Sequence, residues 1–346
     1  MGTHELYMRR AIELARNGAG SVSPNPMVGC VIVHEGRIIG EGWHRTFGGP
    51  HAEVEAIRSV TEPDLLHHAT LYVCLEPCSH HGKTPPCADL IIANRIPEVV
   101  VGTGDPNPMV NGKGIAKLRE AGIKVTAGVL EAECQELNKQ FITRIRKNRP
   151  WILLKWAETS DGFIARTDLS SKWISNARSR QLVHRLRAEM DAVLVGAGTA
   201  AADDPALTVR EWAGSDPVRV VIDPQLRLPS GLKLFDKSVP TLCYNLRETT
   251  ASENLQRIQL TKEHFLQAML ADLSSRNIGS VMVEGGARTM QGFIDAGLWD
   301  EAWRFIAPVS FGTGIHAPVL TMEPWQKSDV EGDSLLVYRN PAAAPI

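Results

Sequence analysis

The chain has 346 residues and a formal net charge of -2, with 43% apolar and 22% charged residues. This length favours two domains over a single core, because domains usually contain about 100–200 residues. The balanced charge gives no sign of a nucleic-acid partner, and no segment approaches the roughly 18 apolar residues that a membrane span requires.

The N-terminal segment, residues 1–18, predicts a helix rather than a signal peptide. Its apolar residues Leu6, Met8, Ile12 and Leu14 are spaced like one helix face, and no long apolar run is present. The six cysteines are too sparse for a disulfide scaffold and fit a reducing compartment. We therefore expect a cytoplasmic protein whose cysteines bind metal or pack in a core.

Short β-rich runs alternate with amphipathic stretches through the first half, which is typical of a layered α/β fold. The predicted strands are Val28–Val33, Thr70–Leu75, Val99–Val101 and Lys124–Ala127. The predicted helices are His51–Val60, Cys87–Arg95, Gly112–Ala121 and Glu131–Asn148. The last helix ends in the basic stretch Arg144–Pro150, and we expect the boundary between two domains, 1–148 and 149–346, at this stretch.

The second half repeats the alternation with different content, so it predicts a second α/β domain. Its predicted strands are Trp151–Ala157, Ala192–Val195, Arg219–Asp223 and Ser280–Glu284, followed by a β-rich segment from Glu301 to Val309. Its predicted helices are Asn176–Met190, Lys262–Arg276 and Ala287–Gly297.

The first half carries residues that suit a catalytic zinc ion. His51-Ala-Glu53 opens a predicted helix, and Pro77-Cys78 and Cys87 follow a strand. Catalytic zinc needs three protein ligands and an open position, where it brings the pKa of bound water toward neutrality. Glu53 is placed to carry a proton from water to a departing amine. Alone, each residue would be an ordinary helix or core residue, but the set matches the zinc-deaminase pattern H-x-E followed by P-C-x-x-C.

The spacing of the two cysteines departs from that pattern. Eight residues, 79–86, separate Cys78 from Cys87, where most zinc deaminases have two. This segment cannot lie within one helical turn and must loop out beside the metal. His80 and His81 are therefore rival ligands, although two prolines before Cys87 favour the return of that thiolate to the zinc.

The string Leu75–Cys87 resembles the signature of the RibD family, the bifunctional deaminase-reductases of bacterial riboflavin biosynthesis. Pro24–Gly29, Gly42–His44 and Asp105–Pro108 support the resemblance. It implies a cytidine-deaminase-like three-layer α/β/α domain with one zinc ion held by His51, Cys78 and Cys87, and with Glu53 as proton shuttle.

The same resemblance implies contacts between the first domain and its substrate. These would come from Asn25, His44, Lys83, Asp105 and Asn107. The compact charge of Lys83 suits a phosphate, and Asn25 offers both donors and an acceptor to a base edge. Without the resemblance, Lys83 would be a solvated surface lysine and Asn25 a turn residue.

The run Gly196-Ala-Gly198-Thr-Ala-Ala201 follows a predicted strand and matches G-x-G-x-x-A, with Asp223 at the end of a later strand. We nevertheless do not expect a Rossmann unit. The stretch Asp203-Asp204-Pro205 would stop the helix almost at once. A short helix N-terminus can still bind a pyrophosphate or ribose through its backbone N–H groups.

The second half resembles the reductase domain of the same family, whose α/β fold is like that of dihydrofolate reductase. The resemblance rests on Lys155–Ala157, Ser160–Gly162, Ser171–Ser175, Gly198–Arg210 and Val283–Arg288. The residues implied to face NADPH or NADP+ are Ala157, Trp173, Thr199, Asp203, Gly286, Ala287, Arg288, Thr289, Met290, Gln291 and Gly292. The residues implied to face the substrate are Ser171, Arg187, Leu207, Arg210 and Glu284.

Elementary chemistry explains why these residue types suit a reductase site. Two arginines can bind a ribose phosphate bidentately, while the cofactor carries the hydride and the protein orients it. Taken alone, Arg187 would be a solvated helix residue, Trp173 a core residue and Gly285-Gly286 a plain turn. No general acid is evident, and NADPH over NADH follows from the resemblance alone.

The resemblance implies two successive reactions on one small phosphoribosylaminopyrimidine. The first is hydrolytic deamination of 2,5-diamino-6-(5-phosphoribosylamino)pyrimidin-4(3H)-one. The second is NADPH-dependent reduction of the ribose of 5-amino-6-(5-phosphoribosylamino)uracil to the ribitylamino product. We expect no nucleic-acid or membrane partner, and a homo-oligomer is compatible with a fused metabolic enzyme.

Two rival functions stand beside this one. The first is a zinc deaminase of another pyrimidine or purine nucleotide, with a non-catalytic second domain. The second is a zinc-stabilised dinucleotide-binding regulator without catalysis. The regulator is disfavoured because Glu53 is present and because structural zinc normally has four protein ligands.

Overall fold

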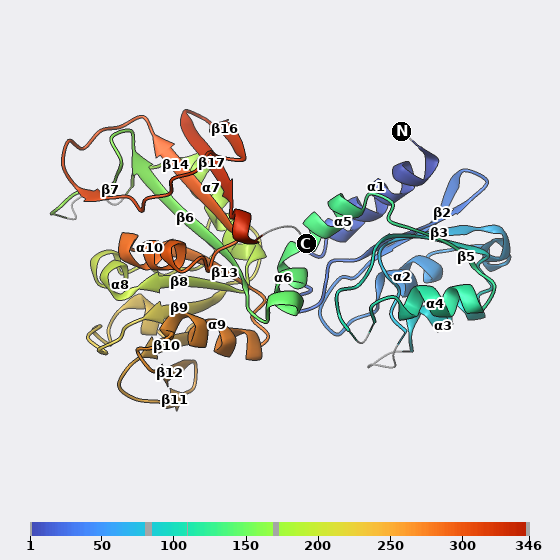
Figure 1. Cartoon of the computed structure of the whole chain (residues 1–346), viewed down its shortest axis with the longest axis horizontal. Helices are drawn as coiled ribbons and strands as arrows, with labels where there is room; N and C mark the ends of the chain where they lie inside the picture. Colours follow the sequence, from blue (N-terminus) through green and yellow to red (C-terminus); the bar gives the residue numbers. More distant parts are fainter. Residues whose placement is uncertain (1, 80–84, 109, 169–172, 344–346) are drawn as a thin grey trace. The chain divides into compact units, whose positions relative to one another are not determined.

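The structure is a computed structural model that describes residues 2–79, 85–108, 110–168 and 173–343. Its contacts divide the chain into two compact units, the first ending at Asn148 and the second beginning at Arg149 (Figure 1). Both units are built from alternating helices and strands, so the predicted α/β class is confirmed.

Within the described residues, the first unit contains a five-stranded sheet in the order β2-β1-β3-β4-β5. The strands are β1 (Gly29–His34), β2 (Arg37–Trp43), β3 (Thr70–Leu75), β4 (Glu98–Thr103) and β5 (Lys124–Ala127). Strand β1 runs antiparallel to β2 and β3, whereas β3, β4 and β5 are parallel. The carboxyl ends of β3 and β4 therefore meet at one edge of the sheet, where Cys78 and Asp105 follow them.

Helices cover both faces of this sheet and give the expected three layers. Helices α1 (Thr3–Arg16) and α5 (Glu131–Leu137) bury Met8, Ile12 and Cys134 against one face. The other face is covered by α2 (Ala52–Arg58), α3 (Cys87–Ala93) and α4 (Lys113–Glu120), and a 3-10 turn (Pro63–His68) precedes β3.

The predicted single helix Glu131–Asn148 is wrong, because two helices occupy this range. Helix α5 ends at Leu137, α6 covers Lys139–Lys147, and Asn138 between them has φ -106° and ψ 22°. The Asn138 side chain accepts a hydrogen bond from Met27 N (2.8 Å) and donates one to Met27 O (2.9 Å). The break therefore fixes the loop that carries Asn25.

Strand β2 is absent from the predicted elements because two glycines interrupt its apolar pattern. These glycines let α2 pack directly on the strand. A Cβ atom at Gly40 would lie 2.6 Å from the Ala56 carbonyl oxygen, and one at Gly42 would overlap the Ala56 amide nitrogen. The sequence therefore lacks the usual strand signal at the place where a helix needs a bare backbone.

The second unit contains, among its described residues, a ten-stranded sheet in the order β11-β12-β10-β9-β8-β13-β6-β14-β17-β16. Its strands are β6 (Trp151–Thr159), β8 (Ala192–Gly196), β9 (Val218–Ile222), β10 (Thr241–Asn245), β11 (Thr250–Ser252), β12 (Leu255–Gln259), β13 (Ser280–Gly285), β14 (Glu301–Ala307), β16 (Gln326–Val330) and β17 (Asp333–Arg339). The central strands from β12 to β14 are parallel, so their carboxyl ends share one edge.

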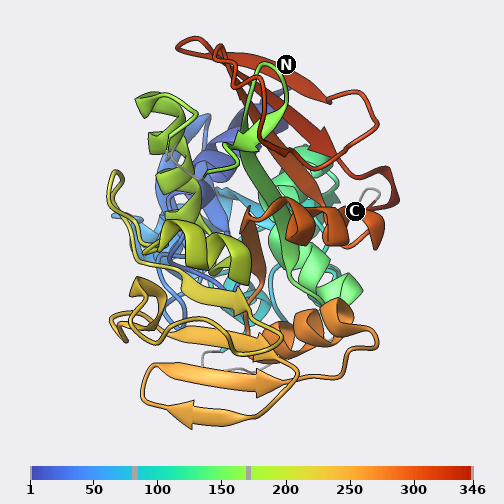
Figure 2. The ribbon, with the colours of Figure 1, turned by 90° about the vertical axis from the view of Figure 1, so that its left-hand side faces the viewer.

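Helices flank both faces of this larger sheet (Figure 2). Helices α7 (Ala177–Glu189) and α8 (Ala197–Asp203) pack on one face, and α9 (Phe265–Ser275) and α10 (Ala287–Asp295) pack on the other. Two 3-10 turns cover Lys233–Phe235 and Pro341–Ala343.

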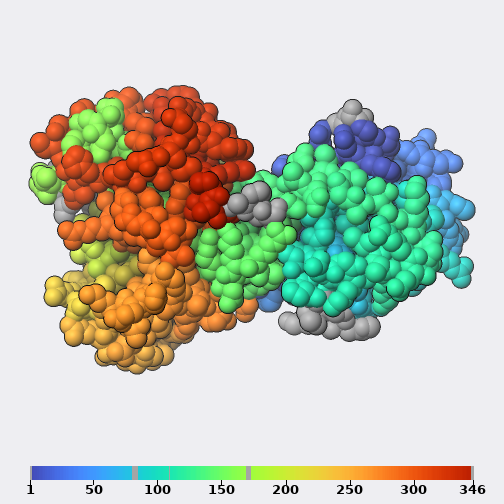
Figure 3. All heavy atoms as spheres, viewed as in Figure 1, coloured from blue at the N-terminus to red at the C-terminus, as the bar shows by residue number. Residues whose placement is uncertain are grey.

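A short pair of strands, β7 (Phe163–Ala165) and β15 (Ile315–His316), joins distant parts of the second unit. Figure 3 shows the green residues around β7 lying among the red residues of the C-terminal segment. Among the helices that the structure describes, none is long and apolar enough to cross a membrane.

Candidate active sites

Three potential metal ligands from separate elements converge in the first unit. His51 is the N-cap residue of α2, Cys78 follows β3, and Cys87 is the first residue of α3. Their ligand atoms all lie within 4.8 Å of one another, and no other such group of three appears in the described ranges. One imidazole nitrogen and two sulfurs are a donor set that suits zinc and leaves a tetrahedral position open.

Hydrogen bonds prepare Cys78 as an anionic ligand. Its sulfur accepts the Cys87 backbone N–H at 3.3 Å and lies 3.6 Å from His51 Nδ1. The Cys87 thiol, the His51 ring and that N–H together lower the pKa of Cys78 to about 4, against the opposing effect of burial. These contacts favour the thiolate form of Cys78.

Glu53 lies in the first turn of α2, two residues after His51, and is only 3% exposed. Burial raises the pKa of its carboxyl, and the positive charge of His51 partly opposes that rise. A carboxyl group with a raised pKa can both accept and return a proton near neutral pH. This position suits the predicted proton shuttle.

His44 and Asn25 form an oriented pair beside His51. The Pro50 carbonyl, 2.9 Å from His44 Nδ1, can only accept, so Nδ1 donates and Nε2 is left to accept from the Asn25 amide at 3.1 Å. Burial lowers the pKa of His44, which keeps the ring neutral. The His44 and His51 rings meet edge to face with centroids 5.7 Å apart. The structure thus brings His44 into contact with His51, and Asn25 into contact with His44.

Glu76 is a residue of this site to which the sequence pattern assigned no role. Its buried carboxylate accepts four backbone N–H groups, from Asp105 (3.3 Å), Gly112 (2.9 Å), Gly114 (3.0 Å) and Ile115 (3.1 Å). It thereby fixes the start of α4 and the turn that carries Asp105 and Asn107.

Asp105 in turn accepts the Asn107 N–H at 2.8 Å, so the two predicted substrate residues are held together. The signal for Glu76 was its place directly before Pro77-Cys78, but its four partners are 29 to 39 residues away in sequence. Lys83, with His80 and His81, lies outside the described residues.

In the second unit, the predicted substrate residues Arg187 and Glu284 form a buried ion pair. Arg187 Nε and Nη2 donate to the two Glu284 oxygens at 2.6 and 2.8 Å, and Nη1 donates to the Thr208 carbonyl at 3.0 Å. Burial alone would raise the pKa of Glu284, but the charge and hydrogen bonds of Arg187 lower it to about 2. All three nitrogens of the Arg187 guanidinium therefore donate hydrogen bonds within the protein.

Lys155, on β6, lies within the field of this pair. Burial lowers the pKa of its ammonium group, while the Glu284 charge raises it and the Arg187 charge lowers it further. A buried lysine with a lowered pKa can give up its proton more readily than a solvated one. The string Lys155-Trp-Ala157 pointed to this strand, but not to Lys155 itself.

Two strand-to-helix turns pack closely at the carboxyl edge of the second sheet. A Cβ atom at Gly285 would lie 2.6 Å from Thr199 Cγ2, and one at Gly196 would overlap Thr289 Oγ1. Gly286, with φ +66°, is the N-cap residue of α10, and no side chain of the described residues caps that helix end. Thr199, Gly286 and Thr289 are thus brought together around free helix N–H groups, which suit a pyrophosphate.

The remaining predicted cofactor residues are spread more widely. Ala157 lies on β6, Asp203 ends α8, and Ala287, Arg288, Gln291 and Gly292 lie on α10. The Met290 side chain packs in the core at 1% exposure, so only its backbone could face a cofactor. Trp173 is 65% exposed, with the Arg180 guanidinium 4.8 Å from its ring centroid, and is joined to none of the other predicted residues by these contacts.

Leu207 and Arg210 follow α8 on a segment held by several groups. Leu207 is buried and has a left-handed φ of +53°. The Arg210 backbone N–H donates to His184 Nδ1 at 3.1 Å, while its side chain is exposed. Ser171 lies outside the described residues.

Family models match both halves of the chain. The model described as the RibD C-terminal domain matches residues 150–335. The model described as the cytidine and deoxycytidylate deaminase zinc-binding region matches residues 1–103. The two matches together cover most of the sequence.

Individual relatives match over nearly their whole length. The chain is 45% identical over 315 residues to the riboflavin biosynthesis protein RibD of Aquifex aeolicus, which covers 89% of this chain and 88% of that protein. The RibD protein of Escherichia coli is 40% identical over 328 residues, with 89% of each chain covered.

Solved structures show the same similarity. A diaminohydroxyphosphoribosylaminopyrimidine deaminase/5-amino-6-(5-phosphoribosylamino)uracil reductase from Thermotoga maritima has a TM-score of 0.90 and 40% identity, covering 98% of this chain and 99% of its own. RibD from Acinetobacter baumannii has a TM-score of 0.88 and 34% identity, covering 97% and 98%.

Proposed function

Since this chain belongs to the RibD family, we propose that the two clusters described above are its deaminase and reductase sites. The chain is a bifunctional enzyme of riboflavin biosynthesis, with a zinc-dependent deaminase followed by an NADPH-dependent reductase. A deaminase with a non-catalytic second domain is not favoured, because the RibD C-terminal model matches the second half.

Its substrate is the phosphoribosylaminopyrimidine that is first deaminated at the ring and then reduced at the ribose. We assign the deaminase domain to residues 1–148 and the reductase domain to residues 149–346. The division of contacts after Asn148 and the two matched ranges support this assignment.

In the deaminase site, His51, Cys78 and Cys87 are the proposed zinc ligands. The observation that carries this proposal is the convergence of their three ligand atoms within 4.8 Å, from the N-cap of α2, the segment after β3 and the start of α3. Bound zinc supplies a Lewis acid that makes water a nucleophile near neutral pH. Glu53, buried beside the ligands, takes the proton of that water and returns it to the departing amine.

The deaminase site recognises its substrate through fixed polar groups. Because His44 Nε2 accepts one hydrogen of the Asn25 amide, the Asn25 carbonyl oxygen is oriented for a donor on the pyrimidine edge. Asp105 and Asn107, fixed by Glu76, supply further polar contacts. Lys83 is the proposed partner of the substrate phosphate.

In the reductase site, NADPH supplies the hydride and the chain orients it against the ribose carbon. The proposed cofactor contacts are Ala157, Trp173, Thr199, Asp203 and the turn from Gly286 to Gly292. The proposed substrate contacts are Ser171, Arg187, Leu207, Arg210 and Glu284. Lys155 is the proposed donor of the proton that the ribose oxygen takes up, because burial lowers the pKa of its ammonium group, against the opposing charge of Glu284.

The surroundings of the enzyme are also proposed. Each of the six cysteines, all within the described ranges, is free of a disulfide, which supports a reducing cytoplasmic location. A homo-oligomer is proposed only by analogy with other fused metabolic enzymes. The small substrate and the near-neutral charge argue against a nucleic-acid partner.

Removal of the metal tests the proposed function as a whole. After treatment with a zinc chelator, we expect ammonia release from the diaminopyrimidine substrate to stop and to return when zinc is added. NADPH oxidation with the deaminated substrate should continue, because the proposed zinc ligands all belong to the deaminase site. Metal analysis of the purified full-length enzyme should give one zinc per chain. A metal-free protein that deaminates at the full rate would refute the site.

A further inference from the structure

Arg219, on β9, is an unusual buried residue of the second unit. Only 1% of it is exposed, although its guanidinium is always charged. A buried charge of this kind needs several hydrogen-bond partners. The identity of those partners indicates what the residue does.

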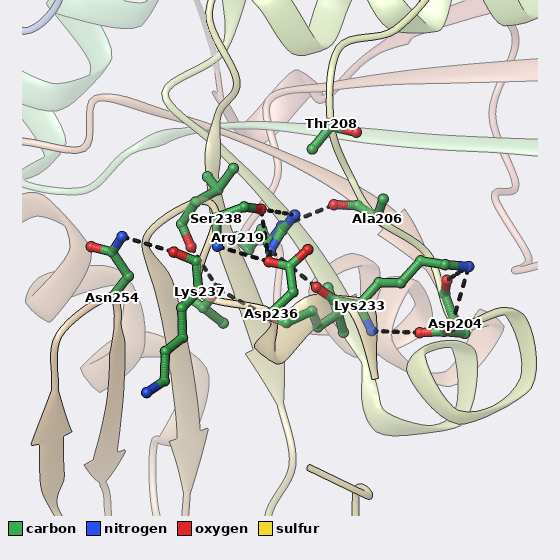
Figure 4. A network of polar contacts seen from close by, with 12 residues as sticks. Asp204, Ala206, Thr208, Arg219, Lys233, Asp236, Lys237, Ser238 and Asn254 are labelled. Atoms are coloured by element: carbon green, nitrogen blue, oxygen red, sulfur yellow. Dashed lines mark hydrogen bonds and ion pairs between the residues drawn. The ribbon is translucent and has the colours of Figure 1, made fainter. Parts of the chain in front are cut away.

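Four hydrogen bonds hold the guanidinium in place (Figure 4). Nε donates to the Ala206 carbonyl at 2.9 Å, and Nη1 donates to the Lys233 carbonyl at 3.1 Å and to Asp236 Oδ1 at 2.7 Å. Nη2 donates to Ser238 Oγ at 3.2 Å. The Asp236 carboxylate is half-exposed, and its contact with Arg219 lowers its pKa to about 2. Arg219 therefore links the surface turn after Lys233 to the backbone at Ala206.

Ala206 lies in the middle of the segment Asp203–Arg210, which is held at neighbouring points as well. Arg187 Nη1 donates to the Thr208 carbonyl at 3.0 Å. The Lys233 backbone N–H donates to Asp204 Oδ1 at 2.7 Å. Lys233, whose carbonyl accepts from Arg219, therefore also binds this segment. Two guanidinium groups thus hold the carbonyls on either side of Leu207.

Leu207 shows why these two contacts matter. Its φ of +53° lies in the left-handed region, which a leucine rarely adopts. Such a conformation persists only where the surroundings enforce it, and it is common at functional sites. Loss of the bond from Arg219 to Ala206 would remove one of the contacts that enforce this backbone conformation. The segment that carries Asp203 and Arg210 would then be held less firmly.

We propose that Arg219 is a positioning residue of the reductase: it fixes the segment that presents Asp203 to NADPH and Leu207 and Arg210 to the substrate. This inference rests on the proposed function of that segment. Because only 1% of Arg219 is exposed, we expect it to act through this segment and not through a contact with either ligand. If Arg219 only held β9 and the turn at Lys233 together, its replacement would lower stability without changing the KM of the folded enzyme. If Arg219 is a positioning residue, its replacement changes KM.

The test compares Arg219→Met and Arg219→Lys in the full-length enzyme. KM for NADPH and for the deaminated substrate are measured, with the deaminase rate as internal reference for concentration and urea unfolding followed by reductase activity as the measure of folding of the second unit. We expect Arg219→Met to raise both KM values about tenfold or more, because small displacements of binding groups have large effects. Arg219→Lys should give smaller increases, since an ammonium group can still donate to a carbonyl.

The matched control is Asn254→Ala. It removes the hydrogen bond from Asn254 Nδ2 to the Lys237 carbonyl (2.9 Å), in the same region but without a contact to Arg219 or the segment. This variant should keep both KM values. If Arg219→Met does not fold, the KM values of Arg219→Lys test the positioning role: raised values support it and parent values overturn it.

Direct variants of the segment separate the two levels of the proposal. If Asp203→Ala raises KM for NADPH and Arg210→Ala raises KM for the substrate while both Arg219 variants match the parent, the positioning role is overturned and the proposed site stands. If Asp203→Ala and Arg210→Ala also match the parent, the proposed reductase site is wrong and the role of Arg219 falls with it. KM increases in all of these variants support both the proposed reductase site and the positioning role of Arg219.

Discussion

A Glu53→Gln enzyme is expected to release ammonia about 10²- to 10⁴-fold more slowly than the parent, the range that a positioned general acid-base group typically contributes. Glutamine has nearly the same size as glutamate but cannot accept and return a proton at neutral pH. Because Glu53 is buried beside the ligands without being one of them, the variant should keep its zinc. Ammonia release, zinc content and NADPH oxidation with the deaminated substrate would be measured on the same preparation.

The reductase half supplies the control for this experiment. NADPH oxidation with the deaminated substrate should be unchanged in Glu53→Gln, which shows that the chain is folded and active elsewhere. A variant that deaminates at the parent rate would exclude Glu53 as the proton shuttle. A variant that loses zinc as well would point instead to a structural role of the carboxylate beside Cys87.

An Arg187→Met enzyme is expected to lose reductase activity and to destabilise the second unit by about 3–5 kcal/mol, because it leaves one partner of a buried ion pair uncompensated. Glu284 receives two hydrogen bonds from Arg187, and the side chain of Glu284 is 8% exposed. The loss should appear in urea unfolding followed by reductase activity, while the deaminase rate stays at the parent level.

A double variant checks the cause of that loss. In the double variant Arg187→Met/Glu284→Gln the carboxylate that lost its guanidinium partner is itself removed, so part of the stability should return, whereas reductase activity should not. A double variant no more stable than Arg187→Met alone would mean that the pair does not carry the effect.

The same pair predicts a pH dependence of stability. The pKa of Glu284 falls from its ordinary 4.5 to about 2 in the folded protein. A carboxyl group with a lowered folded-state pKa stabilises the protein fully above its unfolded pKa and loses that contribution as the pH falls toward the folded value. The parent should therefore lose stability between pH 4.5 and 2 more steeply than Glu284→Gln. Parallel curves would contradict the ion pair as the source.

Much of the fold follows from the sequence because apolar periodicity is local. The strand Thr70–Leu75 has the bounds that its pattern predicted, and the helix Ala177–Glu189 lies within the predicted Asn176–Met190. Positions that depend on distant partners were missed. Asn138 breaks a predicted helix because its side chain bonds Met27, 111 residues away. The helix predicted from Lys262 begins only at Phe265, after His264 adopts a left-handed φ of +54°.

The candidate sites divide in the same way. The motif residues His51, Cys78 and Cys87 could be selected from sequence because zinc chemistry restricts the side chains that can serve. Arg187 and Glu284 could be selected as site residues by resemblance, but their ion pair joins positions 97 apart and has no local signal. Arg219 looked like one residue of a predicted strand, since its burial and its four partners depend on tertiary structure.

The carboxylate of Glu76 prevents other anions from binding at the start of α4 in the deaminase domain. The start of a helix such as α4 normally attracts phosphates from solution, because its N–H groups point outward and carry partial positive charge. In this enzyme an internal anion already occupies that position. Cellular phosphate and unrelated nucleotides therefore find no vacant anion site at this helix end, and the phosphorylated substrate has to be recognised through other groups.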